Sequence, residues 1–165
     1  MRLTTRTNLA MRTLMYCAIN PDRIVRKHEI ASSCNASENH LAQVIHMLAQ
    51  KGYLRTVRGR AGGLRLARPP SEINLGDIFD DFESCLPFAE CFGSDCQNGV
   101  HSASCPMAGC CQLKGVLSEA LDAFYARLRQ TSVADLVAGS TMPDSLDPAN
   151  RMPETAGTED LLRVA

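Results

Sequence analysis

Two helical patterns joined by a short turn, followed at once by a basic β-hairpin, limit the fold of this 165-residue chain more than any other feature. The helices are predicted at residues 26–34 and 37–52, the second beginning at a good N-cap and ending at a glycine. Residues 53–57 and 64–68 have strand composition, and the turn 58–63 between them is rich in arginine and glycine. A helix-turn-helix with such a hairpin predicts a winged helix, whose wing would reach a phosphate backbone or a minor groove.

The second helix of this motif has an outward face of short polar side chains that can meet base edges in a major groove. Any solvated helix face could have this composition, and the basic hairpin that follows favours the DNA-binding interpretation. The predicted DNA contacts are Arg2, Arg12, Ser37, Glu38, Asn39, His40, Gln43, Arg58, Arg60 and Arg65.

Charge divides the chain into two halves. Residues 1–70 carry 12 Lys and Arg against 3 Asp and Glu, whereas residues 71–165 carry 5 against 15. A basic half joined to an acidic half predicts a polyanion-binding domain at residues 1–70. The glycine-rich turn contains neither a GxGxxG nor a GxxxxGK[ST] motif, which disfavours a nucleotide-phosphate loop.

Six of the eight cysteines fall within the 27 residues 85–111. The chain has no signal peptide and no apolar run of the ~18 residues that span a membrane, so we expect a cytoplasmic protein whose thiols bind metal or respond to redox conditions. Thiolates suit both zinc and iron–sulfur clusters, and a thiol switch is a third interpretation. A cysteine-based redox enzyme is a more distant alternative, because the chain has no C-x-x-C motif; we expect no enzyme activity.

A stripe of apolar residues from Leu113 to Leu128 predicts a helix of about five turns, preceded by a short helix at residues 74–82. A helix with apolar residues along one face needs a partner that covers this face. The partner is either the predicted first helix at residues 5–19 or the same helix of a second subunit. The fold class is therefore mainly α with a small β-hairpin. Its predicted parts are a winged helix-turn-helix domain (1–70), a cysteine segment with a long dimerisation helix (71–138) and a disordered, proline-containing tail (139–165).

Four pieces of the sequence resemble one family of transcription regulators. They are residues 1–4 (MRLT), 57–66 (VRGRAGGLRL), 73–77 (INLGD) and 105–113 (CPMAGCCQL). The family comprises winged-helix regulators with an iron–sulfur cluster, including the nitric-oxide sensor NsrR, the iron regulator RirA and the cluster-assembly regulator IscR. The resemblance covers residues 1–137, and residues 90–92 and 113–117 look most like NsrR.

The resemblance implies a cluster, [4Fe-4S] in this family, held by three cysteines. Carried over by position, these ligands are Cys91, Cys105 and Cys111, the last two forming the family's C-x5-C pair. The interval between Cys91 and Cys105 is longer than the usual NsrR spacing, so Cys96 is a credible substitute ligand. Cys85 and Cys110 are additional.

A second departure from the family pattern lies at position 8. Some NsrR proteins use an aspartate of the partner subunit there as the fourth ligand, but this chain has Asn8, whose neutral amide is a poor ligand for iron. The fourth iron could then be held by Asn8, Cys96 or water. The resemblance implies a homodimeric repressor that binds double-stranded DNA and responds to nitric oxide. Iron availability is the alternative signal.

Overall fold

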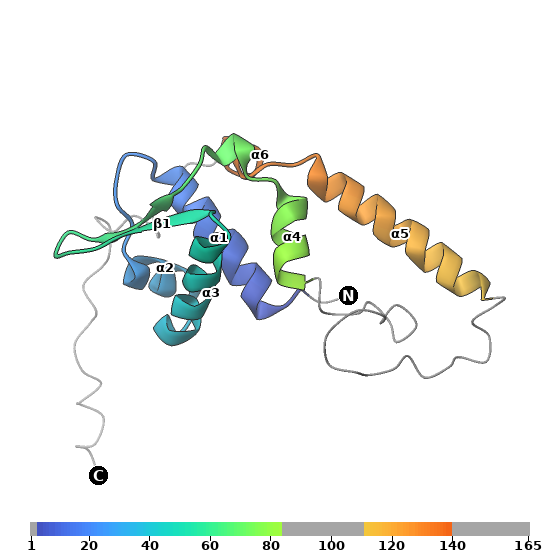
Figure 1. The fold of residues 1–165 in the computed structure, drawn as a ribbon, viewed down its shortest axis with the longest axis horizontal. Helices are drawn as coiled ribbons and strands as arrows, with labels where there is room; N and C mark the ends of the chain where they lie inside the picture. Colours follow the sequence, from blue (N-terminus) through green and yellow to red (C-terminus); the bar gives the residue numbers. More distant parts are fainter. Residues whose placement is uncertain (1–2, 84–110, 140–165) are drawn as a thin grey trace, which may run out of the picture.

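The computed structural model describes residues 3–83 and 111–139. The elements in chain order are α1 (Thr5–Ile19), α2 (Lys27–Cys34), α3 (Glu38–Gln50), β1 (Leu54–Val57), β2 (Gly63–Leu66), the 3-10 turn η1 (Pro70–Glu72), α4 (Leu75–Glu83), α5 (Gln112–Arg129) and α6 (Val133–Val137) (Figure 1). The predicted class, mainly α with one small hairpin, is confirmed. The predicted tail beyond Gly139 and the cysteine segment before Cys111 lie outside the described residues.

Helix α1 is the centre of the core, because it contacts α2, α3, α4, α6 and β2. The hydroxyl of Thr4 accepts a hydrogen bond from the Thr7 backbone N–H at 3.1 Å and so caps the start of the helix. Ala10 and Leu14 are fully buried. The buried hydroxyl of Thr13 donates to the Leu9 carbonyl at 2.6 Å, so this polar group carries no desolvation penalty.

Helices α2 and α3 form the predicted helix-turn-helix. Asn35, in the left-handed conformation with φ of 49°, ends α2. The Ser37 hydroxyl accepts from the His40 backbone N–H at 3.2 Å and begins α3. The fully buried residues of α3 are Leu41, Val44 and Leu48, at the spacing of one helix face.

The wing is an antiparallel hairpin whose register runs from Leu54 opposite Leu66 to Val57 opposite Gly63. Val25, just before α2, adds two backbone hydrogen bonds to this hairpin: its N–H donates to the Leu64 carbonyl at 2.9 Å, and its carbonyl accepts from the Leu64 N–H at 2.8 Å. A Cβ atom on Gly63 would lie 2.4 Å from the Val25 carbonyl oxygen, so this close approach requires glycine. The pairing of Val25 with Leu64 joins positions 39 residues apart and has no local signal in the sequence.

The end of α5 meets the start of α4 at a tight corner. The Leu75 N–H donates to the Thr131 carbonyl at 3.0 Å, and the Val133 N–H donates to the Ile73 carbonyl at 2.9 Å. A Cβ atom on Gly76 would lie 2.3 Å from Cγ of Arg129, which explains the glycine in the first turn of α4. Helix α6 also packs against α1. The corner formed by α4, α5 and α6 is therefore held against the DNA-binding half of the chain.

The apolar stripe of α5 is covered only toward its C-terminal end. There the Phe124 ring packs edge-on against Phe79 of α4, with centroids 5.7 Å apart. Toward the N-terminal end Leu113 and Val116 are 64% and 62% exposed, and Figure 1 shows this half of α5 extending away from the other helices. The intramolecular partner of α5 is therefore α4, which was not among the two partners considered from the sequence, the first helix and the same helix of a second subunit. No helix within the described residues is long and apolar enough to cross a membrane.

Candidate DNA interface and cluster-ligand residues

The outward face of α3 carries the predicted base-contacting side chains. Glu38, Asn39 and Gln43 are exposed, and His40 is partly exposed. Ser37 is also exposed, but its hydroxyl is engaged in the helix cap. The Glu38 carboxylate pairs with Lys27 Nζ of α2 at 3.0 Å, which holds this acidic group beside a cation at the start of the helix.

The wing presents a row of arginines. Arg58, Arg60 and Arg65 are exposed, as predicted, and Gly59 between the first two adopts φ of 113°, a conformation open to glycine. Arg55, which the sequence analysis left out, lies directly opposite Arg65 in the register and is also exposed. Like charges directly across a β-ladder are unfavourable without an anion between them. The alternation of the strand could have identified Arg55, but only with the register known.

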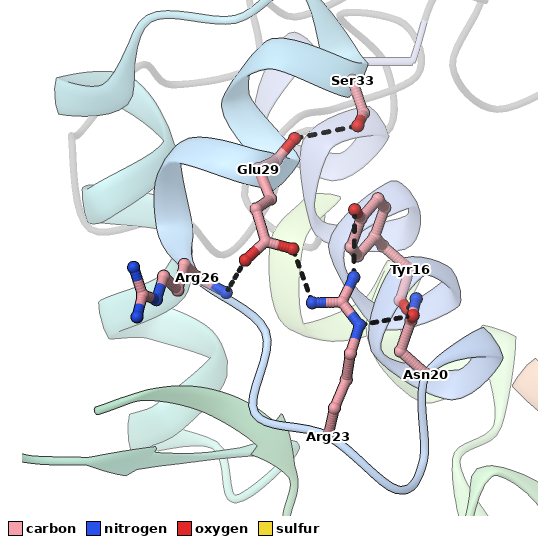
Figure 2. Close-up of polar contacts among 6 residues, drawn as sticks. All are labelled: Tyr16, Asn20, Arg23, Arg26, Glu29 and Ser33. Atoms are coloured by element: carbon pink, nitrogen blue, oxygen red, sulfur yellow. Dashed lines mark hydrogen bonds and ion pairs between the residues drawn. The ribbon is translucent and has the colours of Figure 1, made fainter. Parts of the chain in front are cut away.

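A network around Arg23 connects the end of α1 to the start of α2 (Figure 2). Its guanidinium donates to the Glu29 carboxylate at 2.6 Å, to Oδ1 of Asn20 at 2.8 Å and to the Tyr16 hydroxyl at 3.4 Å. The other Glu29 oxygen accepts from the Arg26 backbone N–H at 3.2 Å, at the start of α2. Partial burial alone would lower the pKa of Arg23, but the hydrogen bond and the charge of Glu29 raise it, and the net direction is upward.

The Arg26 side chain points away from this network in Figure 2 and is exposed. Arg12 is exposed on α1, and its guanidinium interacts with Cys34 at the end of α2. Arg2 lies outside the described residues. The structure thus places every other predicted DNA-contact residue on the surface of the helix-turn-helix domain.

Among the predicted cluster ligands only Cys111 and Asn8 fall within the described residues; Cys91, Cys96 and Cys105 do not, and neither do Cys85 and Cys110. Cys111 is half-buried and is the N-cap residue of α5, where its side chain makes no capping hydrogen bond. The first turn of α5 contains no acidic residue. The thiol therefore lies at the positive end of a long helix, a favourable place for an anionic group.

Asn8 lies on an exposed part of α1, one turn after Thr4. The Glu83 carboxylate at the end of α4 accepts hydrogen bonds from the Thr4 N–H at 3.0 Å, from the Thr4 hydroxyl at 2.8 Å and from the Thr7 hydroxyl. The cysteine segment begins two residues later. Asn8 and the end of α4, which precedes that segment in the chain, are consequently at the same end of the molecule.

The two cysteines outside the segment have the character of structural thiols. Burial raises the pKa of Cys17 to about 12, with only partial opposition from the charge of Arg23. Burial also raises the pKa of Cys34, although the charge and hydrogen bond of Arg12 act in the opposite direction. Both thiols stay protonated at neutral pH and are poor metal ligands. No group of three or more metal-ligating side chains occurs within residues 3–83 and 111–139.

Comparison with known protein families gives one decisive match. The model of the Rrf2 family, described as an iron-dependent transcriptional regulator, matches residues 3–139. The chain belongs to the Rrf2 family. It is therefore a DNA-binding transcriptional regulator and not an enzyme, as expected from the sequence.

Several named relatives of this Rrf2 regulator are similar over most of their length. The chain is 38% identical over 138 residues to the HTH-type transcriptional regulator NsrR of Shouchella clausii, and the match covers 83% of this chain and 89% of that protein. The NsrR of Bacillus subtilis is 37% identical, with 83% and 90% covered. Protein aau3 of Rhizobium meliloti is 42% identical over 137 residues, with 83% and 85% covered.

Solved structures of regulators have the same fold. The global cysteine regulator CymR of B. subtilis superposes with a TM-score of 0.65 at 20% identity, covering 86% of this chain and 99% of CymR. IscR of T. potens gives a TM-score of 0.65 at 23% identity, covering 86% and 89%. These likenesses confirm the predicted winged-helix architecture.

Proposed function

We propose that this Rrf2 regulator is a homodimeric repressor that holds an iron–sulfur cluster, [4Fe-4S] by family resemblance, in its cysteine segment and releases DNA when nitric oxide reacts with it. The observation that carries the proposal is the position of Cys111. This cysteine is the N-cap residue of α5, and α4, which precedes the cysteine segment in the chain, packs against α1 of the DNA-binding domain. The proposed parts are those expected from the sequence: residues 1–70, 71–138 and 139–165.

The proposed ligands are Cys91, Cys105 and Cys111, with Cys96 or Asn8 as the fourth. The available donors fit an iron–sulfur cluster, because thiolates are its usual ligands and the half-buried thiol at the start of α5 is not engaged in capping. When bound, such a cluster supplies iron that reacts with nitric oxide. The cysteine segment that would hold it follows α4 in the chain, and the hydrogen bonds of Glu83 to Thr4 and Thr7 connect the end of α4 to the start of α1 in the DNA-binding domain.

Iron availability is the second candidate signal, and the description of the matching family model as iron-dependent favours it. Two titrations of anaerobically purified protein distinguish the signals, one with nitric oxide and one with an iron chelator, each followed by cluster absorbance and by DNA binding. If DNA binding is lost at low nitric oxide and is retained in the chelator titration, the nitric-oxide proposal is supported. If it is lost with the chelator and retained with nitric oxide, the iron-responsive proposal is supported. Retention of DNA binding in both titrations contradicts both proposals.

For the wing, we expect Arg60→Gln to weaken binding to all DNA sequences alike. Its exposed guanidinium beside Gly59 is placed to meet phosphate, and removing one such cation from the phosphate backbone should reduce the slope of log K against log salt by about one unit. Fluorescence anisotropy at several salt concentrations measures this slope. Arg127→Gln, at an exposed arginine of α5, is the control; an equal change in slope there would contradict a specific role of the wing.

For α3, we expect Gln43→Ala to change sequence preference instead. Removing a bidentate hydrogen-bonding side chain costs about 1–3 kcal/mol at the base pair that it reads, whereas binding to other sequences stays unchanged. Selection from a random pool of duplexes, followed by sequencing, compares the variant with the wild type. Gln50→Ala, at the exposed last residue of the same helix, should retain the wild-type preference. If Gln43→Ala also retains it, base readout lies elsewhere.

For the homodimer, we expect Val116→Glu to weaken self-association. Two-fold symmetry places each substitution in the interface twice, and losing the burial of one valine, about 1.5–3 kcal/mol, already raises the dimer dissociation constant at least about tenfold. Sedimentation equilibrium measures this constant. Ala126→Glu, exposed on α5 outside the apolar stripe, should leave it unchanged. A Val116→Glu protein that dimerises like the wild type would exclude this face as the interface.

A further inference from the structure

One carboxylate of α4 reaches two elements of the DNA-binding domain at once. Oδ1 of Asp81 lies 2.7 Å from Lys51 Nζ, and Oδ2 accepts a hydrogen bond from the Tyr53 hydroxyl at 2.7 Å. Asp81 is two residues from the end of α4, shortly before Cys85, where the cysteine segment begins. It therefore joins the helix that leads into that segment to residues 28 and 30 positions earlier in the chain.

Both partners of Asp81 occupy structural junctions. Lys51 is the C-cap residue of α3, and its backbone N–H donates to the Met47 carbonyl at 3.0 Å. Tyr53 immediately precedes β1 and links α3 to the wing, because its N–H donates to the Leu48 carbonyl at 2.9 Å and its carbonyl accepts from the Ala67 N–H at 3.0 Å. One side chain of α4 thus contacts both the C-terminal end of α3 and the residue that immediately precedes the wing.

The Tyr53 side chain is held in place for this contact. The residue is only 2% exposed, and the Arg68 guanidinium lies 4.7 Å from the centre of its ring. Burial, followed by the hydrogen bond to Asp81, raises the pKa of the phenol, so the hydroxyl remains a donor. By contrast the Lys51 side chain is 50% exposed, and its ion pair is screened by water. The hydrogen bond to Tyr53 is the firmer of the two connections.

The neighbouring acidic residues of α4 do not make this connection. Asp80 pairs with Arg129 of α5 at 3.1 Å. Asp77 lies one turn earlier on α4 and is exposed, and its charge acts on the Tyr53 hydroxyl only at longer range. Among these acidic residues of α4, Asp81 is therefore the one whose side chain directly contacts the end of α3 and the residue that precedes the wing.

We propose that Asp81 is a positioning residue that transmits the state of the cysteine segment to α3 and the wing through Tyr53 and Lys51. This inference rests on the proposed function, because it requires DNA affinity to depend on cluster occupancy. Packed helices and strands shift as units, so a movement of Asp81 would change the placement of α3 and of the wing together, through its contacts with Lys51 and Tyr53. Asp81 itself has no contact with DNA in this mechanism.

The test compares DNA affinity with and without the cluster. The probe is a labelled duplex selected from a random pool by the wild-type protein, and the cluster-free form is prepared with an iron chelator. The quantity of interest is the ratio of the two dissociation constants. Allosteric couplings typically change an affinity about 5–150-fold. We expect the ratio of Asp81→Ala to be at least about fivefold smaller than that of the wild type, or to fall to one. Tyr53→Phe, which keeps the ring beneath Arg68, should lower the ratio in the same direction.

Asp77→Ala is the matched control, because it removes the same charge from the same helix without removing a hydrogen bond to Tyr53, and its ratio should equal that of the wild type. A purely structural role of Asp81 would shift both dissociation constants equally and leave the ratio unchanged, which would overturn the inference. If Asp81→Ala fails to fold, a wild-type ratio in Tyr53→Phe overturns it instead. A wild-type protein with equal affinity in both forms would overturn the inference, because DNA affinity would then not depend on cluster occupancy. The proposed function fails separately, if neither the nitric oxide titration nor the chelator titration lowers DNA binding.

Discussion

Replacing Cys111 with alanine is expected to abolish the bound iron and inorganic sulfide of the anaerobically purified protein. Cys111 is the half-buried residue at the start of α5, and its thiol makes no capping hydrogen bond that the substitution would remove. The fold should therefore survive, because alanine leaves the first turn of the helix with its packing intact. Iron and sulfide analysis, the absorption spectrum and the thermal midpoint are the measurements.

Cys110→Ala is the matched control, one residue earlier, and should keep the full complement of iron. Cys91→Ala and Cys105→Ala should behave like Cys111→Ala, whereas Cys96→Ala decides whether that cysteine is the fourth ligand. A full cluster in Cys111→Ala would contradict the ligand assignment. Zinc in place of iron in the wild-type protein would keep the thiolate site but contradict the cluster proposal.

Replacing Glu29 with alanine is expected to have the largest effect on stability among the substitutions considered. The carboxylate accepts from Arg23 and from the Arg26 backbone N–H, and its side chain is only 12% exposed. Hydrogen bonds to charged groups contribute about 1.5–3 kcal/mol each, and allowing for screening at the 35%-exposed Arg23 the free energy of unfolding should fall by about 2–3 kcal/mol. At about 2–4 °C for each kcal/mol in a chain of this size, the midpoint of thermal unfolding should fall by about 4–12 °C.

Glu38→Gln tests the same chemistry at the surface of the same motif. Lys27 and Glu38 are 40% and 52% exposed, so losing this ion pair should change the free energy of unfolding by less than about 0.5 kcal/mol. Chemical denaturation of both variants provides the comparison. Equal losses of stability would mean that Arg23 does not connect α1 to α2 in solution in the way Figure 2 shows.

Much of the fold could be predicted from residues close together in the sequence. Ser37 caps α3, Gly52 follows its end, and the spacing of Leu41, Val44 and Leu48 identifies the buried face; each signal acts within four residues. The glycine turn between two strand-forming runs likewise identifies the wing. The ligand assignment relied on resemblance alone, and for all of its residues, Cys91, Cys96, Cys105, Cys111 and Asn8, it remains a prediction.

The family, the order of the elements and the amphipathic character of α5 could be predicted from the sequence, because caps, periodicity and short motifs are local properties of a chain. The packing of α5 on α4, the pairing of Val25 with the wing and the hydrogen bond of Asp81 to Tyr53 became visible only in the folded chain. Those contacts join positions 28 or more residues apart, and which carboxylate meets which hydroxyl depends on how the helices pack around α1. No local pattern distinguishes Asp81 from Asp80, although their side chains connect α4 to different parts of the molecule.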